Sequence, residues 1–135
     1  MITFNNINKF KSDGVIVIKN FISKLKANEI QNKLQDYLER NKFKLKGKDI
    51  NYINGEVNSL HNIKDKYFID ICKGRKVIDT CSKLLNTNVK FKHCEYFAKP
   101  AKIGLASPMH QDNYYWNLKN PNAVTMWIAL TPVSY

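Results

Sequence analysis

A histidine and an aspartate stand two residues apart in the run SPMHQDNYYWNL, which covers residues 107–118. Side chains two apart on a β-strand point to the same face, so a strand here would bring His110 and Asp112 into one pocket and turn Gln111 away. An imidazole nitrogen and a carboxylate oxygen are two of the three ligands in the 2-His-1-carboxylate site of non-haem Fe(II). The spacing therefore predicts half of a metal site, but it also suits a hydrogen-bonded pair on a strand.

Longer stretches of sequence around this motif add three features. The run EYFAKPAKIGLASPMHQDNYYWNL leads a predicted strand into a Lys–Pro loop and then places aromatic residues after the His-Gln-Asp. The run AVTMWIALTPVS supplies a Thr-x-Trp-x-Ala-Leu strand about fifteen residues later. Together they resemble the phytanoyl-CoA dioxygenase family of Fe(II)/2-oxoglutarate oxygenases. The opening FKSDGVIVIKNFIS is similar to that family's helix–strand entry, whereas residues 42–85 match only loosely.

The resemblance implies a fold as well as a chemistry. The expected class is α+β, with N-terminal helices packed on an incomplete double-stranded β-helix, a jelly-roll or cupin-like core. Residues 1–135 would form one C-terminally truncated domain, with a mainly helical layer in 1–88 and the first jelly-roll strands in 89–135.

The resemblance also implies site residues. It assigns Fe(II) binding to His110 and Asp112, and it places Trp127 in the wall of the pocket for the cosubstrate 2-oxoglutarate. Candidates for the same pocket, without a defined role, are Tyr96, Lys99 and Tyr114.

Two further groups that the family needs are not found after the motif. These are a second His and, about ten residues beyond it, an Arg that pairs with the distal carboxylate of 2-oxoglutarate. His61 and His93 both precede the motif, and no Arg follows Arg75. We therefore expect this chain to be the N-terminal part of a longer oxygenase, inactive by itself, with its remaining ligand and Arg beyond Tyr135.

The implied reaction is hydroxylation of a small organic substrate by O₂, coupled to conversion of 2-oxoglutarate to succinate and CO₂. An alternative function is a non-catalytic jelly-roll module that binds a small molecule in the same pocket. A downstream His followed by an Arg favours the enzyme, and the absence of both favours the binding module.

The secondary-structure signals divide the chain into helices first and strands later. Apolar residues at helical spacing predict the helices, and β-branched or alternating residues predict the strands. The predicted elements are helices at 4–12, 26–41 and 65–85, the last interrupted at Gly74 and Arg75, and strands at Val15–Ile18, weakly at Ile50–Ile53, at Val89–Phe97 and at Ala123–Val133.

The net charge of +11 raises the question of a nucleic-acid partner. Only two of the 22 basic residues are Arg, the side chain preferred for base and phosphate recognition, and the excess is spread along residues 9–102. We therefore expect a solvated, Lys-rich surface and no nucleic-acid partner. The chain has no apolar run long enough to cross a bilayer and no apolar leader segment, which predicts a soluble cytoplasmic protein without a membrane partner.

The three cysteines, Cys72, Cys81 and Cys94, are an odd number and lack CxxC spacing. This pattern predicts small buried thiols and argues against a disulfide framework or a zinc cluster.

Overall fold

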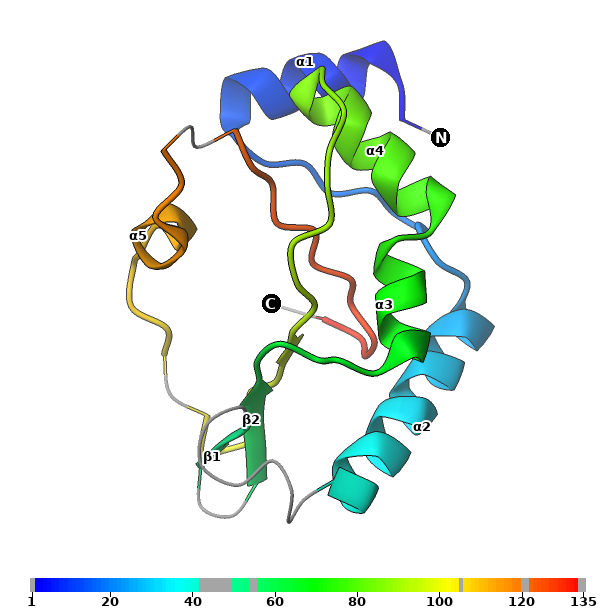
Figure 1. Cartoon of the computed structure of the whole chain (residues 1–135), viewed down its shortest axis with the longest axis vertical. Coiled ribbons are helices and arrows are strands. Elements are labelled where there is room, and N and C mark those ends of the chain that lie inside the picture. The colour runs from blue at the N-terminus through cyan, green and yellow to red at the C-terminus, as the bar shows by residue number, and fades with distance from the viewer. Residues whose placement is uncertain (1, 42–49, 54–55, 105, 120–121, 134–135) are drawn as a thin grey trace.

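The computed structural model describes residues 2–41, 50–53, 56–104, 106–119 and 122–133. Helices occupy the periphery, and a small sheet lies at one end of the molecule (Figure 1). This is an α+β arrangement, as predicted. The elements in chain order are α1 (Phe4–Asp13), α2 (Lys24–Asn41), β1 (Ile50–Ile53), β2 (Glu56–Leu60), α3 (Lys66–Cys72), α4 (Arg75–Leu85), β3 (Tyr96–Phe97) and α5 (Asp112–Trp116).

Local sequence fixes both ends of α1. Thr3 and Asn6 form a capping box in which each side chain accepts a hydrogen bond from the other's backbone N–H, which satisfies two amides that the helix leaves free. Gly14 ends the helix with φ +73°, and its N–H donates to the carbonyl of Phe10. Glycine adopts this left-handed conformation without the steric cost that a Cβ brings.

The sheet has three antiparallel strands in the order β1-β2-β3. The hairpin of β1 and β2 carries a register shift between Asn51 and Tyr52. On its other edge, β2 pairs Ser59 with Phe97 and Leu60 with Tyr96. The sheet thereby connects the middle of the chain to the segment that leads toward the His-Gln-Asp motif.

The core lies where α2, α3 and the end of β2 meet. Its central residue is Leu60, with 1 % of its surface exposed, and Phe68 of α3 packs edge-to-face against Tyr37 of α2 with ring centroids 5.8 Å apart. Burial of these apolar side chains is the main force that holds the helices against the sheet. The buried residues of this cluster are Ile30, Leu34, Leu60, Ile63 and Phe68.

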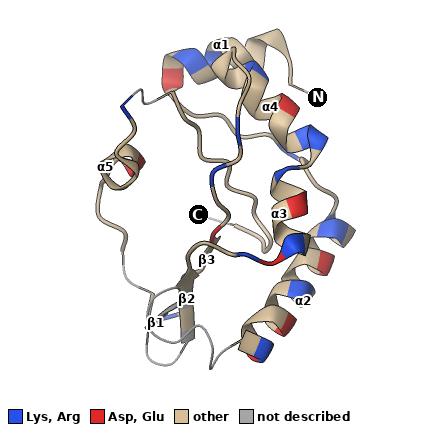
Figure 2. Cartoon of the chain, viewed as in Figure 1, with Lys and Arg blue, Asp and Glu red and all other residues tan. Residues whose placement is uncertain are grey.

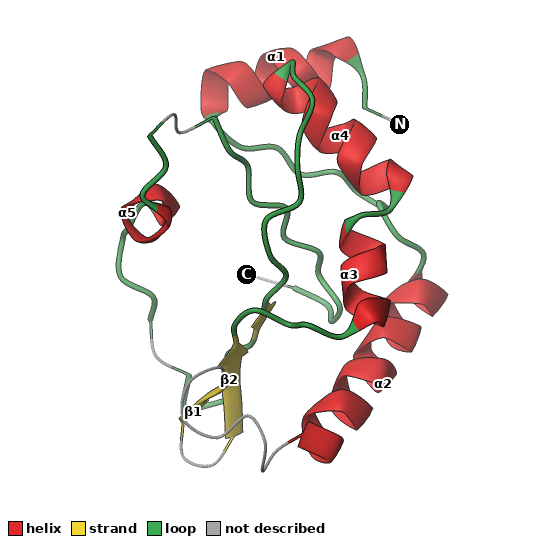
Figure 3. Cartoon of the chain, in the orientation of Figure 1, coloured by secondary structure: helices red, strands yellow, loops and turns green. Residues whose placement is uncertain are grey.

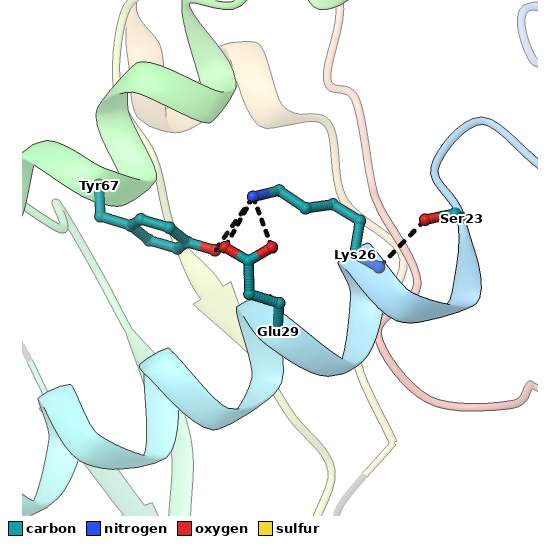
Figure 4. A network of polar contacts seen from close by, with 4 residues as sticks. All are labelled: Ser23, Lys26, Glu29 and Tyr67. Atoms are coloured by element: carbon teal, nitrogen blue, oxygen red, sulfur yellow. Dashed lines mark hydrogen bonds and ion pairs between the residues drawn. The ribbon is translucent and has the colours of Figure 1, made fainter.

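A polar network also connects α2 to α3 (Figure 4). The Tyr67 hydroxyl donates to the Glu29 carboxylate at 2.7 Å, and the Lys26 ammonium donates to both carboxylate oxygens at 2.9 Å. Burial raises the pKa of Tyr67, and the hydrogen bond to Glu29 acts in the same direction. At neutral pH Tyr67 therefore keeps the proton that it donates across the two helices.

The structure confirms the predicted helices and corrects most of the predicted strands. Helix 65–85 is divided into α3 and α4, because Gly74 interrupts it as expected. The segment Val15–Ile18 is not a strand: it pairs with no strand among the described residues, and Val17 is 81 % exposed.

The C-terminal third also departs from expectation (Figure 3). The predicted strand Val89–Phe97 is reduced to β3, and the described residues of Ala123–Val133 form no strand. A β-strand requires hydrogen bonds between its backbone and that of a neighbouring strand. High β-propensity of a segment is therefore not sufficient for it to form a strand.

Basic residues are distributed over α1, α2, α4 and the loops, and acidic residues lie among them on the helices (Figure 2). Several form i,i+3 or i,i+4 pairs, such as Lys9 with Asp13 and Lys26 with Glu29. None of the helices in the described ranges has the length and apolar character needed to cross a membrane.

Candidate metal-binding site

The His110 ring is oriented by the backbone of its own loop. Its Nδ1 lies 2.8 Å from the carbonyl oxygen of Pro108. A carbonyl oxygen only accepts hydrogen bonds, so Nδ1 carries the proton in the neutral ring and Nε2 keeps its lone pair. A hydrogen bond from the remote ring nitrogen to a carbonyl is the usual support for a metal-binding histidine.

The Asp112 carboxylate presents one oxygen to this ring. Asp112 begins helix α5, and its Oδ1 lies 3.4 Å from His110 Nε2. Its other oxygen, Oδ2, accepts a hydrogen bond from the Thr125 hydroxyl at 2.7 Å. Each of the two side chains is thus held by a hydrogen bond at one atom, and its other polar atom, His110 Nε2 or Asp112 Oδ1, faces the other side chain.

The two facing atoms, His110 Nε2 and Asp112 Oδ1, are both acceptors when the imidazole is neutral. Such a pair is stabilised only by a proton or a cation between the lone pairs. Two bonds of about 2.1 Å from one ion span a separation of this size, so the donor set fits a divalent transition metal. Both side chains are 44 % exposed, which leaves the position accessible from solvent.

The local backbone explains this proximity differently from the prediction. The motif does not lie on a strand, because α5 begins at Asp112. Gln111 nevertheless has extended dihedral angles, with φ −115° and ψ 126°. One extended residue is enough to bring its two neighbours to the same side of the chain, and His110 Nε2 and Asp112 Oδ1 therefore lie 3.4 Å apart.

A third ligand is not grouped with this pair. Within the ranges that the structure describes, no set of three or more His, Cys, Asp or Glu side chains is arranged to hold a metal ion. His61 and His93 are the other two histidines of the sequence. The structure places neither of them with His110 and Asp112.

Trp127 lies on the segment that also carries Thr125, and it is 64 % exposed. A cavity of about 290 Å³ is lined by residues between Asn62 and His93, and Trp127 is not among them. Of the other pocket candidates, Tyr96 packs against the core and Tyr114 is 84 % exposed. The pocket role of Trp127 therefore stays a prediction.

A second polar cluster surrounds Glu95. Its Oε1 lies 3.2 Å from His93 Nε2 and 3.4 Å from His61 Nδ1, and His61 Nε2 lies 3.3 Å from the Ser59 hydroxyl. The series Ser59–His61–Glu95 has the connectivity of a hydrolase triad. Ser59 is only 4 % exposed, however, so its hydroxyl is too buried to attack a substrate. The cluster is a polar link between the end of β2 and the segment before β3.

Sequence reasoning missed the two groups that orient the side chains of His110 and Asp112. The carbonyl of Pro108 is a backbone group, so no residue type in the sequence indicates that it would contact His110. Thr125 is thirteen residues from Asp112, and a threonine at that distance is not distinguishable from the others by sequence alone.

The hydroxyl of Thr125 gives a direct prediction. Thr125→Val removes the donor to Asp112 Oδ2 while keeping the side-chain shape, and we expect about tenfold weaker binding of Zn(II), the low end of the range for such supporting contacts. Thr125→Ser should retain wild-type affinity, and Thr131→Val, the same substitution at an exposed position six residues on, is the matched control. Isothermal titration calorimetry measures the difference. Equal affinity of Thr125→Val and Thr131→Val would show that Thr125 does not support the carboxylate.

Comparison with known proteins is consistent with the resemblance seen in the motifs. The family model described as "Phytanoyl-CoA dioxygenase (PhyH)" matches residues 10–135, which include the His-Gln-Asp motif and Thr125. No curated protein and no solved structure showed significant similarity to the chain. Because the match covers nearly the whole chain, this protein belongs to the phytanoyl-CoA dioxygenase family, a family of iron- and 2-oxoglutarate-dependent dioxygenases.

Proposed function

We propose that this chain supplies the first two iron ligands of an Fe(II)/2-oxoglutarate-dependent dioxygenase that hydroxylates a small organic substrate. Family membership supports the reaction class. The observation that carries the assignment to particular residues is the approach of His110 Nε2 to Asp112 Oδ1, at 3.4 Å, with each side chain anchored by a separate hydrogen bond.

Each residue of the half-site has a distinct part in this proposal. His110 binds through Nε2, because the Pro108 carbonyl holds the proton on Nδ1. Asp112 binds through Oδ1 and supplies a negative charge that neutral imidazoles lack, while Thr125 keeps Oδ2 from rotating into the ligand position. Bound Fe(II) would supply the activation of O₂ that is coupled to oxidative decarboxylation of 2-oxoglutarate.

The proposal includes groups that the described residues do not provide. A third iron ligand and an Arg for the distal carboxylate of 2-oxoglutarate belong to the family pattern, and we place them in sequence downstream of Tyr135. Trp127 would line the cosubstrate pocket once the remaining strands complete a jelly-roll core. That completion would also cover Trp127 and Val133, which are 64 % and 67 % exposed here.

The 135-residue chain alone is therefore expected to form no succinate. It offers two of three ligands and lacks the Arg, whose charge-assisted hydrogen bonds to a carboxylate contribute about 1.5–3 kcal/mol to binding. The experiment adds Fe(II), ascorbate, 2-oxoglutarate and O₂ to the chain and, in parallel, to a protein extended with its downstream sequence, and measures succinate by mass spectrometry.

Three outcomes of this experiment are informative. Succinate from the extended protein alone supports the oxygenase. Binding of 2-oxoglutarate without turnover by the extended protein would favour the non-catalytic binding module instead. Succinate from residues 1–135 alone would contradict the proposed ligand set and would implicate an upstream residue such as His93.

A further inference from the structure

The cavity of about 290 Å³ lies between the loop that follows β2, helix α3 and the segment before β3. Neither His110 nor Asp112 lines it, so it is separate from the candidate metal-binding site. Its volume is at the lower end of the range of small-molecule sites, and its wall combines polar and apolar side chains as such sites do. The cavity is therefore a candidate binding site of its own.

The polar part of the cavity wall carries positive charge. Lys64 and Lys92 contribute to it from two segments of the chain, and Asn62 and His93 are their neighbours in the wall. Among the described residues, no Asp or Glu lines the cavity. A cavity lined by charge of one sign concentrates ions of the opposite sign, so this one favours an anion.

The two lysines of the cavity differ from the lysines of the helices. On the helices, Lys9, Lys26 and Lys66 each pair with an acidic residue three or four positions away. In the part of the chain that the structure describes, neither Lys64 nor Lys92 forms an ion pair with a carboxylate. Their charges are therefore available to a bound ligand.

Two carboxylates that lie close to these lysines in the sequence have other partners. Asp65 accepts a hydrogen bond from the backbone N–H of Tyr67 at 2.9 Å, which caps α3. Glu95 Oε1 lies 3.4 Å from His61 Nδ1 and 3.2 Å from His93 Nε2. Both carboxylates are engaged by contacts of the fold and leave the lysines without an internal counter-ion.

The remainder of the cavity wall is apolar. Ile63 is buried, and Ile69 and Phe91 are half-buried. On the polar side, the Lys92 ammonium lies 5.5 Å from the centroid of the Trp116 ring of α5. This cation–π contact restrains the long lysine side chain and leaves its charge in place. The wall thus offers a cationic part and an apolar part to the same ligand.

We propose that this cavity binds a small organic carboxylate, with its charged group at Lys64 and Lys92 and its apolar part against Ile69 and Phe91. The charge of the two lysines selects the anion, and burial of the apolar part against the side chains of α3 and the segment before β3 adds affinity. The site uses no residue of the proposed iron-binding pair, so the two proposals are tested separately.

Three ligands test the charged and apolar parts one at a time. 3-Phenylpropionate has a carboxylate and a ring, acetate has only the carboxylate, and 3-phenylpropionamide has the ring and a neutral amide. Each is titrated into the ¹⁵N-labelled chain while backbone amide signals are followed by nuclear magnetic resonance. We expect 3-phenylpropionate to shift the amides of Asn62, Lys64 and residues 91–93, and the other two ligands to bind at least about tenfold more weakly.

Substitution of single lysines tests the assignment to residues. Lys64→Gln and Lys92→Gln should each weaken binding of 3-phenylpropionate about threefold to fivefold, the effect of losing one exposed ion pair. Lys66→Gln is the matched control, because it removes the same charge from a nearby lysine that pairs with Asp70 and does not line the cavity. It should bind 3-phenylpropionate as the wild type does, and the spectrum of each variant shows that the fold is kept.

Three results would overturn the proposal. The first is the absence of a saturable shift of the cavity amides with 3-phenylpropionate. The second is equal affinity for 3-phenylpropionate and its amide, which would show that the cavity does not select charge. The third is a loss of affinity in Lys66→Gln as large as in the two cavity variants, which would show that the net charge of +11 alone attracts the anion.

Discussion

In the proposed oxygenase, Asp112→Ala should reduce succinate formation more than about 100-fold, because loss of a ligand exceeds the 10–100-fold cost of losing a group that only supports one. Asp112 is the only carboxylate that the described residues bring to His110 Nε2, and neutral imidazoles alone hold Fe(II) poorly. Asp112→Glu should also be severely impaired, since one extra methylene displaces the carboxylate by about 1 Å.

A matched control for this substitution is Asp79→Ala on α4. Asp79 forms a solvent-exposed pair with Arg75 at 3.5 Å, and both residues belong to α4. Its replacement should leave turnover at the wild-type value. Near-normal turnover in Asp112→Ala, measured with saturating Fe(II), would rule out Asp112 as a ligand.

Leu60→Ala should lower the free energy of unfolding by about 3–5 kcal/mol, the cost of a large-to-small change at a fully enclosed position. Leu60 is the most buried residue of the core, at 1 % exposure, and it lies where β2 pairs with β3. Because a domain of this size has only about 5–15 kcal/mol of stability, this loss is a large fraction of the total, and the variant should unfold at a clearly lower urea concentration than the wild type. Urea denaturation followed by circular dichroism measures the change.

Val17→Ala is the control for the core substitution. Val17 is also a branched aliphatic residue, but it is 81 % exposed, so truncating it removes little buried surface. We expect its unfolding midpoint to stay close to that of the wild type. If Leu60→Ala and Val17→Ala unfold at the same urea concentration, the core does not lie where the structure places it.

The helices were predictable because their signals are local. Thr3, the 3.6-residue apolar period of α2, and Gly74 between α3 and α4 each act within a few residues of the chain. Strand formation depends on a distant partner, and Val15–Ile18 has strand composition but no neighbouring strand in the described part of the molecule. The pairing of β2 with β3 joins residues nearly forty apart, which no local pattern indicates.

The candidate site likewise combines features that local sequence indicates with contacts that it does not. The two-residue spacing of His110 and Asp112 predicted that their side chains approach one another, but it did so through a strand, whereas the structure achieves the approach with one extended residue before α5. The contact with Pro108 is local, but it involves a backbone carbonyl that no residue type indicates, and the contact with Thr125 depends on tertiary structure. The metal role of His110 and Asp112, and the pocket role of Trp127, still depend on the family resemblance.

The central claim, that His110 Nε2 and Asp112 Oδ1 bind one divalent metal ion, is tested most directly by nuclear magnetic resonance of the histidine rings. Zn(II), a diamagnetic substitute for Fe(II), is titrated into ¹⁵N-labelled chain while the imidazole nitrogens of all three histidines are observed. We predict that His110 Nε2 shifts to a metal-bound value while Nδ1 keeps its proton, and that Asp112→Asn abolishes the shift. Binding through His110 Nδ1, or a shift confined to His61 and His93, would contradict the account.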